Sequence, residues 1–185
     1  MKNEDLRIVK TKKALYNSLL ELMREKSFEE IKVSDICSNA LINRSTFYAH
    51  FDDKYDLFTY YIENLKASLI LELKKNTNIN STKDYYLGLI KILLDHIEEK
   101  KENYLAIIIN NRNSIVTDIL IDIIDKDITY NLSKLENNNK YIPNKIISSF
   151  YLGAALSVGI TWLKDINKYK KEDIINYLSK LIPDD

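Results

Sequence analysis

Hydrophobic residues recur along this chain at the three- and four-residue spacing that places side chains on one face of an α-helix. Leu15, Leu19, Leu22 and Met23 show this spacing first, at i, i+4, i+7 and i+8. Glycine (3) and proline (2) are scarce, which favours helices over strands in the long periodic segments. The sequence therefore predicts an all-α protein of about nine helices, over residues 5–26, a segment ending near 40, 44–51, 53–75, 83–100, 102–109, 115–135, 143–165 and 172–181.

Polar and proline-containing stretches mark where these helices begin and end. Asp53 followed by Asp56 resembles a capping box and predicts the start of the long helix over residues 53–75. Residues 76–83 are polar and predict a loop at a domain boundary, and residues 137–140 predict a second loop. Pro143 suits the first position of a helix, where the N–H that proline lacks would have no partner.

Residues 33–51 read as two short helices joined by a tight turn, and the second helix carries residue types that bind nucleic acid. Ile36, Ala40, Ile42 and Phe47 supply the apolar faces, and the Asn43 side chain can cap the second helix by accepting from first-turn amides. Residues 36–51 contain no acid, although the chain has 27, as expected of a surface that approaches phosphates. After the cap come residues that contact phosphates and base edges, namely Arg44, Ser45, Thr46, Tyr48 and His50.

The order of residues in this region resembles the N-terminal domain of TetR-type transcriptional regulators. The resemblance rests on Ile-Lys-Val-Ser-Asp-Ile at 31–36, Asn-Arg-Ser-Thr-Phe-Tyr-Ala-His-Phe at 43–51 and Lys-Tyr-Asp-Leu-Phe at 54–58. It implies an all-helical homodimer with a three-helix, helix-turn-helix DNA-binding domain over residues 1–58. It further implies a long linking helix over residues 53–75 and a C-terminal effector-binding and dimerisation domain over residues 76–185.

The resemblance also implies which residues contact DNA. Arg44 can fork onto guanine or clamp a phosphate, and Lys54 stands at a helix start, where its charge and the helix dipole favour phosphate. Thr11 and the nearby lysines either touch phosphate or lie on a solvated face. Phe47 and Phe51 are assigned to the core. The DNA-binding set carried over by the resemblance is Asn43, Arg44, Ser45, Thr46, Tyr48, His50 and Lys54.

Two residues depart from the family pattern. Leu41 stands in the turn between the two short helices, and Ser27 follows the first helix, where the family commonly has glycine. Glycine is favoured at such positions because a left-handed backbone costs it little. We therefore expect Leu41 either to adopt a strained conformation or to re-route the turn.

The last two predicted helices are the candidate dimer surface. Small residues spaced four apart let another helix approach closely, and the flanking apolar residues supply area for an isologous two-fold interface. The run from Phe150 to Leu163 also resembles a C-terminal domain found in part of the TetR-type family, and a helix buried within its own chain is the alternative. The predicted interface comprises Phe150, Gly153, Leu156, Gly159, Ile160, Leu163, Ile174 and Leu178.

The favoured function is a homodimeric repressor that binds a palindromic double-stranded DNA operator and is released by a small-molecule effector. The alternatives are an activator or adaptor whose C-terminal domain binds a protein, and a dimeric interaction module without DNA binding. Salt dependence of binding distinguishes the first two from the third. Ligand-binding residues are not assigned: Tyr85, Tyr86, Tyr104 and Tyr130 could line a cavity, but in a chain with 13 tyrosines core or surface packing is the better explanation.

Composition bounds the remaining classes of function. The net charge is zero, with 27 basic and 27 acidic residues, so only the docking face need be basic. The single cysteine, Cys37, excludes an intrachain disulfide and is expected to be buried. The uncharged residues 146–163 are at the lower limit for a membrane span, but a protein interface explains them better. We expect no enzyme, cofactor, metal site or membrane association, and a cytoplasmic location.

Overall fold

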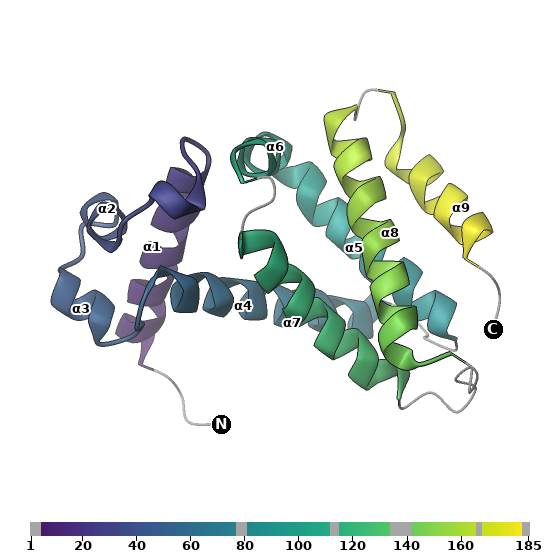
Figure 1. Ribbon diagram of the computed structural model, residues 1–185, viewed down its shortest axis with the longest axis horizontal. Coiled ribbons are helices and arrows are strands. Elements are labelled where there is room, and N and C mark those ends of the chain that lie inside the picture. Colours follow the sequence, from purple (N-terminus) through teal and green to yellow (C-terminus); the bar gives the residue numbers. More distant parts are fainter. Residues whose placement is uncertain (1–4, 77–80, 112–114, 134–141, 166–167, 183–185) are drawn as a thin grey trace. The chain divides into compact units, whose positions relative to one another are not determined.

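The computed structural model describes residues 5–76, 81–111, 115–133, 142–165 and 168–182 (Figure 1). Over these residues the protein is all-helical, which confirms the predicted fold class. The elements are α1 (Leu6–Met23), the 3-10 helix η1 (Phe28–Glu30), α2 (Val33–Asn39), α3 (Arg44–Tyr48), α4 (Lys54–Asn76), α5 (Thr82–Glu99), α6 (Lys101–Asn110), α7 (Ile115–Leu132), α8 (Asn144–Lys164) and α9 (Lys171–Leu181).

Several helix ends differ from the predicted ones by one to three residues. Helix α1 ends at Met23 rather than residue 26, and α3 ends at Tyr48 rather than residue 51. Pro143 is the N-cap of α8 and not its first helical residue, and its carbonyl accepts from the amide of Ile146 at 2.8 Å. The predicted start of α4 is confirmed, since Asp53 accepts from the amides of the second and third helical residues at 2.8 and 2.9 Å. The loop predicted over residues 137–140 lies outside the described residues.

The chain divides into two compact units. The first unit comprises residues 1–64 and 102–120, and the second comprises residues 65–101 and 121–185. Helix α6 and the start of α7 therefore pack with the N-terminal helices. The predicted division of roles, with DNA reading over residues 1–58 and effector binding and dimerisation over residues 76–185, concerns function and stays a prediction.

The first unit is built around aromatic and aliphatic side chains from α1, η1, α2, α3 and α4. The side chains of Leu15, Leu19 and Met23 are fully buried, as the helical spacing predicts. Ser18 lies on the same buried face, and its hydroxyl donates to the carbonyl of Ile36 at 2.8 Å, which joins α1 to α2. Further core residues of this unit are Phe28, Ile31, Cys37, Phe47, Phe51, Leu57, Phe58 and Ile62.

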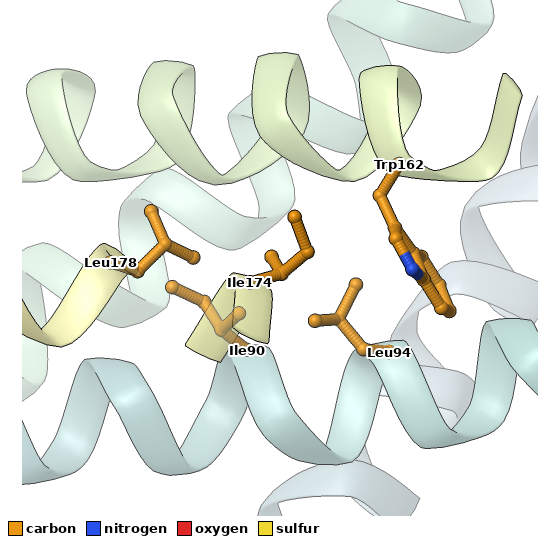
Figure 2. Close-up of a cluster of buried hydrophobic side chains, with 5 residues drawn as sticks. All are labelled: Ile90, Leu94, Trp162, Ile174 and Leu178. Atoms are coloured by element: carbon orange, nitrogen blue, oxygen red, sulfur yellow. The ribbon is translucent and has the colours of Figure 1, made fainter. Parts of the chain in front are cut away.

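The second unit has a hydrophobic core where α5, α8 and α9 meet (Figure 2). Ile90 and Leu94 come from α5, Trp162 from α8, and Ile174 and Leu178 from α9. The indole N–H of Trp162 is satisfied, since it donates to a backbone carbonyl at 3.1 Å. Because these five residues come from three helices, burying them fixes α9 against α5 and α8.

A buried carboxylate joins α7 to α8 in the same unit. Asp125 is 3% exposed, and its carboxylate accepts from the Ser148 hydroxyl at 2.5 Å and pairs with the Lys145 ammonium. Burial raises the pKa of Asp125, but the hydrogen bonds from Lys145 and Ser148 outweigh it and hold this pKa below its usual value. The nearby Tyr86 ring stacks on Tyr151 with ring centroids 4.2 Å apart, and its buried hydroxyl has no hydrogen-bond partner in the described part of the chain.

Candidate nucleic-acid interface

The turn before the third helix is closed by Leu41 in a left-handed conformation. Leu41 has φ of 56°, and it is the one residue other than glycine with positive φ in the described ranges. The Leu41 amide donates to the carbonyl of Ser38 at 3.3 Å, and the Ile42 amide donates to that of Cys37 at 2.9 Å. These two bonds form the Schellman motif, which ends a helix and usually has glycine at the left-handed position. The chain therefore forms a turn that usually contains glycine, with a leucine at the strained position.

Ser27, the second departure, needs no left-handed backbone. It has φ of −66° and is the N-cap of η1. Its amide and hydroxyl both donate to the Glu30 carboxylate, at 3.2 and 3.1 Å. The chain thus leaves α1 by a capped 3-10 turn that any residue able to cap can form.

Helix α3 is held by Phe47 and presents its other faces outward. The Phe47 side chain is fully buried and contacts the rings of Tyr48 and Phe51, at 5.4 and 5.9 Å between centroids. Tyr48 is 51% exposed, and Arg44 and Ser45 are exposed as well. A short helix anchored by one buried ring thus displays the predicted recognition residues to the outside.

The side chains predicted to read DNA lie together on this exposed surface. Asn43, Arg44, Ser45 and Tyr48 are exposed, whereas Thr46 and His50 are partly buried. Within the described ranges, none of the six forms a hydrogen bond or ion pair through its side chain. Asn43 is the N-cap residue of α3, as predicted, but its side chain makes no capping bond, so that part of the prediction was wrong. All six polar side chains are therefore available to a ligand.

Lys54 has a structural task that the sequence did not reveal. Its ammonium donates to the backbone carbonyls of Phe28, Glu29 and Ile31, at 2.8, 3.0 and 2.8 Å. An ammonium has three N–H bonds, and all three are used. Burial lowers the pKa of Lys54, and the negative charges of Glu29 and Asp53 act in the opposite direction. In this conformation the Lys54 side chain holds η1, and only its backbone amide at the start of α4 is left for a phosphate.

The start of α2 is fixed by charge. The Lys26 ammonium and the Lys32 amide both donate to the Asp35 carboxylate, at 2.7 and 3.1 Å. These bonds hold the pKa of Asp35 below its usual value, with the Lys26 hydrogen bond as the largest cause. This acid lies just before the acid-free stretch and is paired within its own chain.

Basic residues of α1 add exposed positive charge to the first unit. Lys10 and Lys13 are exposed, and Thr11 is partly buried. The Lys12 ammonium lies over the ring of Tyr60, 4.9 Å from its centroid. This contact orients one lysine of the cluster, while a phosphate contact by Thr11 or its neighbours stays a prediction.

The predicted dimer residues separate into two groups. Leu163, Ile174 and Leu178 are 3%, 8% and 4% exposed, so their side chains are covered within the chain. Ile174 and Leu178 belong to the core in Figure 2, and we therefore remove these three residues from the candidate interface. The remaining five lie on α8, namely Phe150, Gly153, Leu156, Gly159 and Ile160.

Helix α8 is more apolar than its surroundings in the chain explain. It is the one described helix that is long and apolar enough to cross a membrane, yet only 22% of its most apolar window is buried. Phe150 is 67% exposed and Ile146 is 59% exposed. A Cβ atom added at Gly153 or Gly159 would meet nothing within 4 Å, so nothing described in this chain requires glycine there. Much of the outer face of α8 is therefore left uncovered by the described part of the chain, and its role as a dimer surface stays a prediction.

The tyrosines considered for an effector pocket are scattered. Tyr85 and Tyr86 are buried on α5, and Tyr104 on α6 is partly buried, with its hydroxyl 3.5 Å from that of Tyr61. Tyr130 is 58% exposed. Tyr104 packs in the first unit, and the other three tyrosines belong to the second.

Both halves of the chain match known families of proteins. Residues 15–61 match bacterial regulatory proteins of the tetR family, and residues 84–184 match a transcriptional regulator C-terminal region. A curated relative, the HTH-type dhaKLM operon transcriptional activator DhaS of Lactococcus lactis, is 30% identical over 105 residues, which cover 56% of this chain and 51% of that protein. The chain thus spans about half the length of this relative.

Solved structures share the fold over nearly the whole chain. A TetR transcriptional regulator from Streptococcus agalactiae has a TM-score of 0.66 and 24% identity, with 96% of each chain covered. The transcriptional regulator FadR from Bacillus subtilis, solved in complex with stearoyl-CoA, has a TM-score of 0.62 and 15% identity, covering 91% of this chain and 95% of FadR. Given the helix-turn-helix and the two family matches, the chain belongs to the TetR family of DNA-binding transcriptional regulators.

Proposed function

We propose that the protein binds a palindromic operator as a homodimer and represses transcription until a small-molecule effector releases it. The observation that carries the proposal is the surface on and beside α3, where six polar side chains have no hydrogen-bond or ion-pair partner among the described residues, in a stretch free of acid. Arg44 is the residue placed to fork onto guanine or a phosphate. Asn43, Ser45, Thr46, Tyr48 and His50 supply the accompanying base-edge and backbone contacts.

Dimerisation is required because one short helix reads few base pairs. Two copies of α3 spaced by one turn of DNA would read two half-sites in successive major grooves. The exposed face of α8 supports the proposed interface, since Phe150 and Ile146 are uncovered in the single chain. Gly153 and Gly159 would let the partner's helix approach closely.

The dimer surface is tested with two changes of matched exposure. Phe150→Ser on α8 is expected to yield monomers in analytical ultracentrifugation, because Phe150 is 67% exposed in the single chain and the proposed dimer would bury it. Leu71→Ser on α4, where Leu71 is 57% exposed, is expected to leave the dimer intact. Equal behaviour of the two variants would remove α8 from the interface.

The proposed DNA contacts are tested by selecting duplexes from a random pool and measuring affinity across a salt series. Arg44→Ala is expected to weaken operator binding by about 2–6 kcal/mol, since two copies each lose a contact worth about 1–3 kcal/mol. The salt slope separates the two roles of Arg44: it should become shallower if Arg44 contacts a phosphate, because log K falls by roughly 0.9 per phosphate contact for each decade of salt, and stay unchanged if Arg44 contacts guanine. An unchanged affinity with an intact dimer would refute the assignment of Arg44 as a DNA contact. If no sequence is selected from the pool, an interaction module without DNA binding is favoured.

An activator or adaptor whose C-terminal domain binds a protein is the second candidate. It is favoured by the Lactococcus lactis relative, which is named as a transcriptional activator and matches at 30% identity. The same selected duplex separates the two functions: a small molecule that releases the DNA indicates an effector-controlled repressor. A protein that binds the DNA-bound dimer without releasing it indicates the alternative. In either case we place the protein in the cytoplasm, where the family acts.

A further inference from the structure

A buried asparagine from α6 and its turn holds the junction between α1 and η1. The side-chain oxygen of Asn111 accepts from the amide of Phe28 at 2.7 Å. Its side-chain nitrogen donates to the carbonyl of Met23 at 3.3 Å and to that of Ile107 at 2.8 Å. Asn111 is 5% exposed, so these bonds lie out of water. The three residues that it joins come from α1, η1 and α6.

The chemistry of the junction selects a side-chain amide. Phe28 is the first residue of η1, so its N–H has no partner within that helix. Met23 is the last residue of α1, and its carbonyl is among those that a helix end leaves unpaired. Asn111 satisfies both groups because an amide offers an acceptor and a donor together, which a carboxylate or an alkyl group does not. Next to it, the Asn110 side chain donates to the carbonyl of Arg24 at 2.6 Å.

The opposite end of η1 is held by Lys54 of α4 through its three carbonyl bonds. The 3-10 helix is thus fixed from α6 on its amide side and from α4 on its carbonyl side. It leads within three residues into α2, whose C-terminal turn positions α3. A displacement of α6 would therefore move η1, and through η1 and α2 it would change the orientation of α3.

Chain connectivity links α6 directly to the second unit. Helix α6 follows α5 after a single residue, Lys100, and α7 runs unbroken across the division between residues 120 and 121. We propose that Asn111 is a positioning residue for DNA recognition, which fixes η1 and thereby couples the state of the α6–α7 segment to the orientation of α3. This inference rests on the proposed DNA-binding function. The coupling residue, Asn111, lies 83 residues further along the chain than its partner Phe28.

Hydrogen exchange on the full-length protein, with and without the selected duplex, tests the inference without an effector. Coupling is reciprocal, so DNA bound at α3 must alter α6 if α6 influences α3. In the wild type, saturating duplex is expected to slow exchange in α3 and also in residues 101–110. In Asn111→Ala, protection of α3 at saturating duplex should persist while that of residues 101–110 is lost. The control is Asn64→Ala, which removes an exposed amide that bonds only within α4 and should behave as wild type.

Affinity supplies a second readout that separates positioning from direct contact. Asn111→Ala is expected to weaken duplex binding about tenfold or more with an unchanged salt slope, since no phosphate contact is removed. DNA-dependent protection of α3 without any change in residues 101–110 of the wild type would overturn the inference, whatever the variant does. Failure of every duplex to protect α3 would instead overturn the proposed DNA-binding function, so the two failures are distinguishable. If Asn111→Ala does not fold, the wild-type comparison still decides the outcome.

Discussion

Replacing Leu41 by glycine should stabilise the protein, although it removes a hydrophobic side chain. Leu41 adopts φ of 56°, a conformation that disfavours residues with a Cβ atom. Its side chain is 93% exposed, so the substitution loses almost no packing. The Schellman hydrogen bonds of the Leu41 and Ile42 amides are made by the backbone and survive the change.

The expected gain follows from two opposing terms. Relief of the left-handed strain is worth about 1–2 kcal/mol. The greater freedom of glycine in the unfolded chain costs about 0.4–1 kcal/mol. The net increase in the free energy of unfolding is therefore about 1 kcal/mol, which corresponds to a rise in Tm of about 2–4 °C for a chain of this size.

Urea denaturation of Leu41→Gly, Leu41→Ala and the wild type at one protein concentration measures this difference. The concentration is fixed because the stability of a dimer depends on it. Leu41→Ala is the matched control, since it removes the exposed side chain but keeps a Cβ atom in the left-handed turn. We expect the alanine variant to lie within about 0.5 kcal/mol of the wild type. A glycine variant no more stable than the alanine variant would refute the assignment of strain to this turn.

Three further outcomes are expected. Tyr86→Phe should raise the free energy of unfolding by about 1 kcal/mol in urea denaturation, because the buried hydroxyl has no hydrogen-bond partner among the described residues. A loss of stability would show that the hydroxyl does have a partner. Asp125→Ala should lower it by about 2–3 kcal/mol by removing a buried acceptor, whereas Lys145→Ala, whose ammonium lies on a side chain 66% exposed, should cost about 1 kcal/mol or less. Equal losses would contradict this asymmetry. The Asp35 pKa is lowered in the folded state, so its contribution to stability is present above about pH 4 and is lost as the pH falls through the folded pKa. Lys26→Met should make the fall in stability with decreasing pH less steep in an acid titration. An unchanged fall would exclude the Lys26–Asp35 pair as its cause.

The helices and the helix-turn-helix could be predicted because both depend on the spacing of residues that are close together in the sequence. Leu15, Leu19 and Met23 fall on one face by their period alone, and the structure buries all three. The N-cap of α4 was predictable because Asp53 bonds to amides only two and three residues away. Local signals of this kind act within one or two helical turns.

The unpredicted contacts are those between residues far apart in the chain. Lys54 carries the same charge whether it holds a phosphate or the carbonyls of η1, and only the fold decides between them. Ile174 and Leu178 lie on the apolar face of α9, but that pattern does not say whether α5 or a second chain covers it. Asn111 gave no sequence signal, since an asparagine near a helix end is ordinarily a sign of a break and its partner lies 83 residues away.

The packing of residues 102–120 with the N-terminal helices bears on how this regulator could be re-engineered. A fragment cut after residue 58 would retain every predicted DNA contact but would lack Asn111, leaving the Phe28 amide and the Met23 carbonyl without their partners. Grafting the same segment onto a foreign sensor would leave the same two groups bare unless the new protein supplied an amide at the equivalent place. The segment to transplant is therefore discontinuous in sequence. A functional chimera should carry α6 and its turn together with the helix-turn-helix region.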